Sequence, residues 1–217
     1  MKAITITIIV AGLAFAAFTC GSPFGIKGDG VIKTESREVS EFSKVVVSGA
    51  FDVKWSPGKP ALAISADQNL LPHVRTEVSR GALEIDSRES LQPTRGITII
   101  ISSESLAEME VSGAITFTAS NLSGPDLKLG SSGASTIHVE GSVKNLAADL
   151  TGACSLRAKS LQTQSATLSL TGASNADVTV ADALKASITG ACSVTYSGNP
   201  KSVEKSVTGA GSIHHRE

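Results

Sequence analysis

Apolar and polar residues alternate with a period of two over most of the second half of the chain. The alternation is centred on a short triplet, a hydroxyl residue followed by glycine and alanine, which occurs seven times. Positions two and four before each glycine, and four and six after it, are mostly apolar, whereas the odd offsets are mostly polar. A period of two predicts β-strands with one buried face, and the glycine falls between two such strands.

The triplet glycines recur at nearly constant intervals. They are Gly49, Gly113, Gly133, Gly152, Gly172, Gly190 and Gly209, and the steps from Gly113 onward are 20, 19, 20, 18 and 19 residues. Two short strands cannot bury their apolar face alone, but stacked copies can. The sequence therefore predicts an all-β fold, a parallel β-solenoid with coils of about 20 residues. An antiparallel sandwich is the main alternative, although it would not require glycines at matching places in every repeat.

We interpret the triplets as structural repeat corners. Glycine stands on an inward offset, where it would let the chain bend without a side chain crowding the interior. Alanine is expected to follow because the corner has room only for a methyl group. The stacked hydroxyl groups can bond to one another or to the backbone of the bend. A ligand-binding ladder along one edge is the alternative interpretation of the same column.

The two ends of the stack differ from its middle. Between Gly49 and Gly113 lie four strand-like segments, at residues 61–65, 74–78, 82–86 and 97–102. We expect this excursion to pair with itself and to cap the N-terminal side. At the other end, Lys205 and His215 occupy offsets that are apolar in most earlier copies. Polar residues there predict a terminal coil that faces water.

The N-terminal residues have the pattern of an exported protein. Lys2 precedes an apolar run over residues 3–18, which predicts a signal peptide over residues 1–19; a buried N-terminal strand is the alternative. Cys20, followed by glycine and serine, is a candidate lipid attachment site. Residues 20–30 are expected to form a flexible spacer. The rest, residues 31–217, is expected to be one domain, with N-terminal strands over 31–110 and regular repeats over 111–217.

Cys154 and Cys192 share one offset, two coils apart. Stacking in register would place their Cα atoms roughly 9–10 Å apart, twice the strand spacing, whereas a disulfide needs less than about 7 Å. We therefore predict two free thiols. His214 and His215 are adjacent in the sequence, so their side chains would point to opposite faces of a strand, and a solvated tail is expected there instead of a metal site.

Neither charge nor motifs indicate catalysis or nucleic-acid binding. The formal net charge is −1, with no basic footprint for a nucleic acid. The sequence has no nucleophile elbow, P-loop, zinc motif or dinucleotide fingerprint, so no cofactor and no enzymatic activity are expected. One function to consider is that of a polysaccharide-active enzyme, which would need two carboxylates facing each other across a groove. The outward column five residues after the glycine contains a single acid: it consists of Lys54, Thr118, His138, Arg157, Asp177, Thr195 and His214.

Several blocks of the N-terminal half occur in a recognisable order. They are Phe42-Ser-Lys-Val-Val-Val-Ser-Gly-Ala-Phe-Asp-Val-Lys-Trp55, Ala66-Asp67-Gln68-Asn69-Leu70-Leu71, Gly81-Ala-Leu-Glu-Ile85 and Met109-Glu-Val-Ser-Gly-Ala114. This order resembles the head GIN domain family, described as autotransporter adhesins, over roughly residues 31–217. The resemblance implies an exported bacterial envelope protein with a β-helix-like domain, and it supplies no catalytic motif for positions in this chain.

Taken together, the sequence predicts a non-catalytic module of the cell envelope or cell surface. It would present a polar β-surface to a protein or a glycan, and it would touch the membrane only through an N-terminal lipid. A periplasmic binding or regulatory domain is the alternative, because both functions share every one of these sequence features. If the domain binds a partner, the outer face at odd offsets or the excursion between Trp55 and Met109 is the expected surface.

Overall fold

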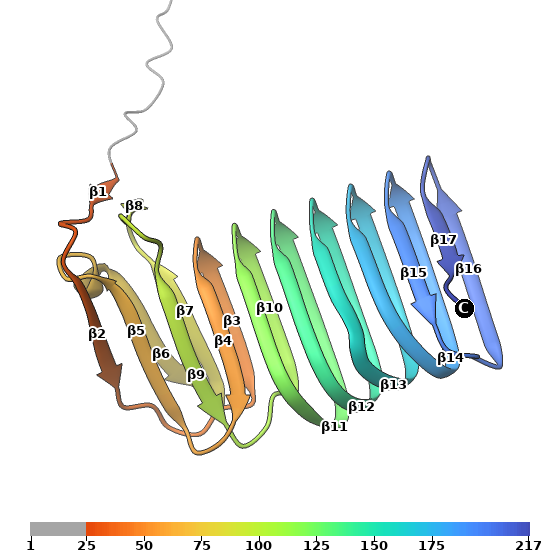
Figure 1. Ribbon diagram of the computed structural model, residues 1–217, viewed down its shortest axis with the longest axis horizontal. Helices are drawn as coiled ribbons and strands as arrows, with labels where there is room; N and C mark the ends of the chain where they lie inside the picture. The colour runs from red at the N-terminus through yellow and green to blue at the C-terminus, as the bar shows by residue number, and fades with distance from the viewer. Residues whose placement is uncertain (1–24) are drawn as a thin grey trace, which may run out of the picture.

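The structure, a computed structural model, describes residues 25–217 and is built almost entirely from strands. Within that part of the chain the helical content is one short 3-10 turn, η1 (Leu71–His73). Over residues 108–215 the chain forms about five turns of a parallel β-solenoid with coils of about 20 residues. Figure 1 shows these coils side by side along the long axis. The predicted fold class is therefore confirmed.

Each coil is folded into two faces. The first half of each long strand pairs on one face and the second half on the other, with a register shift between the halves. The strands of this region are β10 (Glu108–Gly113), β11 (Thr116–Gly133), β12 (Thr136–Gly152), β13 (Ser155–Gly172), β14 (Asn175–Gly190), β15 (Ser193–Ser197), β16 (Ser202–Thr208) and β17 (Ser212–His215). All of their pairings are parallel.

The core lies between the two faces and follows the even offsets. In one column Leu129, Ala148, Leu168 and Ala186 pair in succession, and each is at most 2% exposed. Large and small side chains thus alternate from coil to coil, which lets neighbouring layers interdigitate. Because every coil repeats the same inward positions, the core runs without a break along the stack.

The N-terminal strands extend the solenoid in an order that differs from the order of the chain. Strands β3 (Lys44–Gly49) and β4 (Asp52–Pro57) form a coil that stacks in parallel on β10 and β11. Strands β7 (Ala82–Ser87) and β9 (Thr98–Ser103) then stack in parallel on β3 and β4. The expectation that this excursion pairs only with itself is wrong in this respect, because two of its four segments form one more coil.

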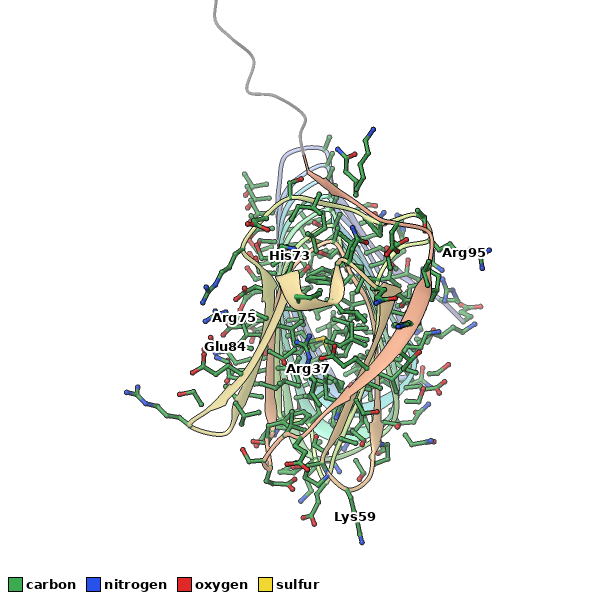
Figure 2. The ribbon with its side chains drawn as sticks, turned by 90° about the vertical axis from the view of Figure 1, so that its left-hand side faces the viewer. Arg37, Lys59, His73, Arg75, Glu84 and Arg95 are labelled. Atoms are coloured by element: carbon green, nitrogen blue, oxygen red, sulfur yellow. The ribbon has the colours of Figure 1, made fainter. Side chains whose placement is uncertain are left out.

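The remaining N-terminal strands close the end of the stack with antiparallel pairs. β5 (Ala61–Asp67) pairs with β9, β2 (Ile32–Arg37) pairs with β5, and β6 (Val74–Ser79) pairs with β7. Arg37 joins the two sides, since its guanidinium donates hydrogen bonds to the carbonyl oxygens of Val74, at 2.6 Å, and Leu71, at 2.9 Å. Figure 2 shows Arg37 in the middle of this end. The excursion therefore caps the N-terminal side, as expected.

Residues 25–30 lie against this capped end and do not form a free spacer. β1 (Ile26–Lys27) pairs with β8 (Leu91–Gln92). The fully buried carboxylate of Asp67 accepts hydrogen bonds from the amide of Gly30, at 2.8 Å, and the hydroxyl of Thr94, at 2.7 Å. Over residues 25–30 the structure therefore differs from the flexible spacer that the sequence predicted. The expected signal peptide and Cys20 lie outside the described residues.

The C-terminal end is covered by polar side chains around one aromatic ring. The ring of His215 stacks on the ring of Tyr196 with centroids 4.8 Å apart, and Lys205 Nζ lies 5.0 Å from the centre of the Tyr196 ring. The expected polar end at these two positions is confirmed. Beside them, Val203 and Val207 of β16 are 37% and 47% exposed, so β16 leaves part of its inward face open to solvent.

Candidate binding groove

The triplet glycines lie at corners where each coil touches the one before it. Gly113 and Gly172 have φ angles of +113° and +101°, a region that favours glycine. A Cβ atom at position 172 would lie 2.7 Å from the carbonyl oxygen of Gly152. That atom would point along the stack, and these glycines are half-buried or exposed. The expected reason for glycine, space in the interior, is therefore wrong, because the side chain is excluded by the backbone of the neighbouring coil.

The backbone of these corners continues the hydrogen-bond ladder between coils. The amides of Ala134 and Ala173 donate to the carbonyl oxygens of Gly113, at 2.9 Å, and Gly152, at 2.8 Å. The alanine side chains are exposed, so the expectation that the corner has room only for a methyl group is also wrong. The hydroxyl groups are exposed as well, with one bond from Ser132 Oγ to Ser112 Oγ at 3.1 Å.

Two residues after Gly133, Gly152, Gly172 and Gly190, small polar side chains are buried. The hydroxyls of Ser135 and Ser174 donate to glycine carbonyl oxygens of the preceding coil, each at 3.1 Å. The thiols of Cys154 and Cys192 make the equivalent contacts, at 3.7 and 3.5 Å. Both cysteines are buried and free, as predicted. Serine and cysteine alternate in this column because both can donate to the same carbonyl.

The long strands bend at the register shift between their two halves. Beside this bend, on the face formed by the first halves, lies a groove of about 490 Å³. Its side chains come from β11 to β14, and those with polar or charged groups include Thr118, His138, Glu140, Arg157, Lys159 and Asp177. Four of these, Thr118, His138, Arg157 and Asp177, belong to the outward column identified in the sequence. The pairings Thr118–His138, His138–Arg157 and Arg157–Asp177 place them on successive coils.

Unequal corner lengths produce the hollow. In the first pair of coils, the three-residue step from Ala119 to Leu122 faces the two-residue step from Val139 to Gly141. In a later pair, the four-residue step from Ala158 to Gln162 faces a step of one residue. Neighbouring corners therefore do not stack flush. Period-two reasoning placed the outward column correctly, but it did not find Glu140 and Lys159, which lie within these irregular steps.

Opposite charges in the groove are only partly paired. Asp177 accepts two bonds from the guanidinium of Arg216, at 2.7 and 3.0 Å, so its charge is balanced from the C-terminal end. Within the described residues, the side chains of Arg157 and Lys159 make no hydrogen bond or ion pair. Both side chains are exposed. The groove therefore offers a guanidinium and an ammonium group to solvent, with Glu140 nearby.

A second hollow, of about 310 Å³, lies on the opposite face beside Val46, Glu110 and Gly130. The one charged residue that lines this hollow, Glu110, belongs to a set of neighbouring charges that pair across coils. The hydrogen bond to Glu110, at 2.8 Å, raises the pKa of Lys44, and the hydrogen bond from Lys128, at 3.1 Å, lowers the pKa of Glu108. Because these groups satisfy one another, this hollow has less to offer a charged ligand than the groove.

Two further properties bear on what the groove can do. Within residues 25–217, no group of three or more histidine, cysteine, aspartate or glutamate side chains is placed to hold a metal ion. A search of the same residues finds no helix of the length and apolar character needed to cross a membrane.

The comparison with protein families agrees with this architecture. The family described as "Putative auto-transporter adhesin, head GIN domain" matches residues 41–200. The chain belongs to this family. The matched region begins just before β3 and extends through the groove. No curated protein matches the chain.

Solved structures share the fold of this GIN domain. A putative adhesin from Bacteroides fragilis matches with a TM-score of 0.72 and 20% identity, covering 88% of this chain and 100% of the other. A putative adhesin from Parabacteroides merdae matches with a TM-score of 0.57, 20% identity and coverages of 88% and 99%. A putative lipid binding protein from Parabacteroides distasonis matches with a TM-score of 0.53, 22% identity and the same coverages. At these identities the likeness establishes the fold, and the adhesin family implies an envelope or surface location.

Proposed function

We propose that this GIN domain is a non-catalytic adhesive module of the bacterial cell envelope, and that it holds its partner in the groove between Thr118 and Asp177. The observation that carries the proposal is the pair of unpaired cations, Arg157 and Lys159, displayed on stacked coils. The backbone of stacked coils loses little freedom when a partner binds, which favours recognition. Membership of an adhesin family supports the same function.

The two acids of the groove are arranged poorly for hydrolysis of a glycosidic bond. Glu140 and Asp177 come from coils separated by the coil of Arg157, so their backbones lie roughly 10 Å apart. A glycosidase needs two carboxyl groups that face each other across the bond, one of them able to donate a proton. Asp177 instead accepts two bonds from Arg216. This arrangement supports a binding role for the groove.

Export and anchoring complete the proposal. Residues 1–19 would direct export, and Cys20 would carry a lipid. β1 is held against the capped N-terminal end of the solenoid, next to β8 (Figure 1). An anchor attached before residue 25 would therefore join the domain at this end and leave the long faces of the solenoid exposed. Replacing Cys20 with serine should abolish labelling by a radioactive fatty acid and shift the protein from the membrane fraction to the soluble fraction.

Accessibility in intact cells tests the adhesive role. An epitope inserted at Gly96, an exposed glycine between β8 and β9 with no atom within 4 Å of its Cβ position, should be cleaved or stained without permeabilisation. Deleting the gene should also reduce attachment of cells to a host or matrix surface, and complementation should restore it. Protection of the epitope behind the outer membrane would instead favour a periplasmic binding or regulatory domain.

A further inference from the structure

We infer that the ligand of the groove is a saccharide that carries carboxylate groups, such as an oligo-uronate. This inference rests on the proposed function, because it names the class of partner for the same groove. Arg157 provides the main contact. A guanidinium presents a planar fork of donors that matches the two oxygens of a carboxylate, and such bidentate pairs are among the stronger hydrogen bonds in proteins.

The charge arrangement around Arg157 selects for an anion. On the next coil its cross-strand neighbour is Asp177, the acid best placed to neutralise it. The carboxylate of Asp177 is engaged by Arg216, which reaches it from the C-terminal end of the chain. Arg157 therefore keeps an open donor fork, and Lys159 adds a second positive charge within the same groove. Glu140 opposes these two cations with one negative charge.

The rest of the groove suits the hydroxyl groups of a sugar. Thr118 and Ser160 line it and can both donate and accept hydrogen bonds, and His138 offers ring nitrogens between them. Ala119 and Val139 supply a small apolar floor. A volume of about 490 Å³ lies within the usual range for small-molecule sites, roughly 300–1,000 Å³. A folded protein partner would need a broader contact surface than this hollow provides.

The backbone of the corner that carries Lys159 is held by a side chain of the next coil. The hydroxyl of Thr179, on the next coil, donates to the carbonyl oxygen of Lys159 at 2.7 Å. The corner that carries Lys159 is thus fixed, while its ammonium group remains exposed. Preorganisation of this kind reduces the entropy that binding must remove.

Calorimetric titration of the purified protein with a uronic-acid trisaccharide tests the inference. The wild-type domain should bind the trisaccharide, should bind the matched neutral trisaccharide at least tenfold more weakly, and should lose affinity as salt rises. Arg157→Gln should weaken binding at least tenfold, and Arg157→Lys should fall between the two. Lys185→Gln is the matched control on another face and should change the dissociation constant less than twofold. Because Arg157 has no partner among the described residues, its variants should have the same melting temperature as the wild type.

Several outcomes would overturn the inference. Equal affinity for the neutral trisaccharide would show that charge is not recognised, and unchanged binding by Arg157→Gln would place the ligand elsewhere. Binding of a sulfated saccharide or an acidic peptide, but not of the uronate, would reject the carboxylated sugar as the ligand class. The proposed function fails separately, if the domain proves inaccessible on intact cells while the uronate still binds to the purified domain.

Discussion

The amide nitrogen of Ala173 donates a hydrogen bond to the carbonyl oxygen of Gly152, one coil earlier, over 2.8 Å. This bond carries the ladder around the corner, where a solenoid could otherwise lose its interstrand pairing. It requires the two backbones to approach closely, and that approach leaves no room for a Cβ atom on Gly172, the residue before Ala173. This contact between neighbouring coils explains why glycine recurs in the triplet.

Replacing Gly172 with valine should destabilise the domain by about 3 kcal/mol or more. The change would combine an unfavourable positive φ with a contact 2.7 Å from a backbone oxygen in the middle of the stack. Gly124→Val is the control, because the Cβ position of Gly124 has no atom within 4 Å, and it should cost less than about 0.5 kcal/mol. Urea denaturation measures both. Equal losses would show that backbone contact between coils does not select glycine.

Replacing Cys154 and Cys192 with serine should preserve the fold. Serine already occupies the equivalent positions 135 and 174, where its hydroxyl donates to a glycine carbonyl. Cys154→Leu should instead cost about 1–3 kcal/mol, because the column has no space for two further carbon atoms. Thermal unfolding compares the variants, and a thiol reagent should react with Cys154 and Cys192 of the native wild-type protein far more slowly than with the same residues of the unfolded chain. Rapid labelling of Cys154 or Cys192 in the native protein would contradict their buried placement.

The capped N-terminal end should loosen in acid. The hydrogen bond from the Thr94 hydroxyl, together with backbone bonds from Thr94 and Gly30, holds the pKa of Asp67 below its ordinary value of 3.8. A depressed pKa in the folded state means that the carboxylate contributes stability above pH 3.8, and that this contribution is lost as the pH falls toward the folded-state pKa.

Asp67→Asn should therefore lower the melting temperature at pH 7, and the difference from wild type should shrink below about pH 4. Hydrogen exchange should report the same change locally, as faster exchange of the Gly30 and Thr94 amides. The control is Asp29→Asn, which alters an exposed carboxylate in the same segment. A gap between Asp67→Asn and wild type that stays constant down to pH 3 would contradict the role of ionised Asp67.

Strand β16 should be far more tolerant of side-chain truncation than β14, the strand on which it stacks. Val207 and Ile188 pair in one inward column, yet Val207 is 47% exposed and Ile188 is 1% exposed. Ile188→Ala should cost about 2–5 kcal/mol, whereas Val207→Ala should cost about 0.5 kcal/mol or less. Chemical denaturation distinguishes them. A large loss for Val207→Ala would mean that another surface covers the end of the stack in solution.

Much of the fold could be predicted because the repeat is local. Each coil from Gly113 onward has the same alternation and the same corner, so the spacing fixes the register. The coil formed by β7 and β9 could not be read in this way, because it carries no triplet: Asp86 stands opposite Ser48 of the next coil. Its place beyond β3 and β4 depends on which strands find open edges after the whole chain collapses.

The candidate site could be predicted to a smaller degree. The outward column pointed to Arg157 and Asp177 as neighbours, and this pairing is present. The residue that engages Asp177, however, is Arg216, which is 39 positions away in the chain. Arg216 directly follows β17, which stacks in register on β15, so Asp177 and Arg216 lie two coils apart. The column offsets alone did not show that the long Arg216 side chain reaches back past β15 to Asp177.

The sequence by itself determined the solenoid, its corners and its inward columns, since these follow from interactions between one coil and the next. The tertiary structure alone decided the order of the N-terminal coils, the reason for the glycines and the open charge of the groove. Those properties depend on distances between backbones of different coils and on which of several nearby charges pair first. Asp177 is paired with Arg216, and its cross-strand neighbour Arg157 faces solvent without a partner among the described residues.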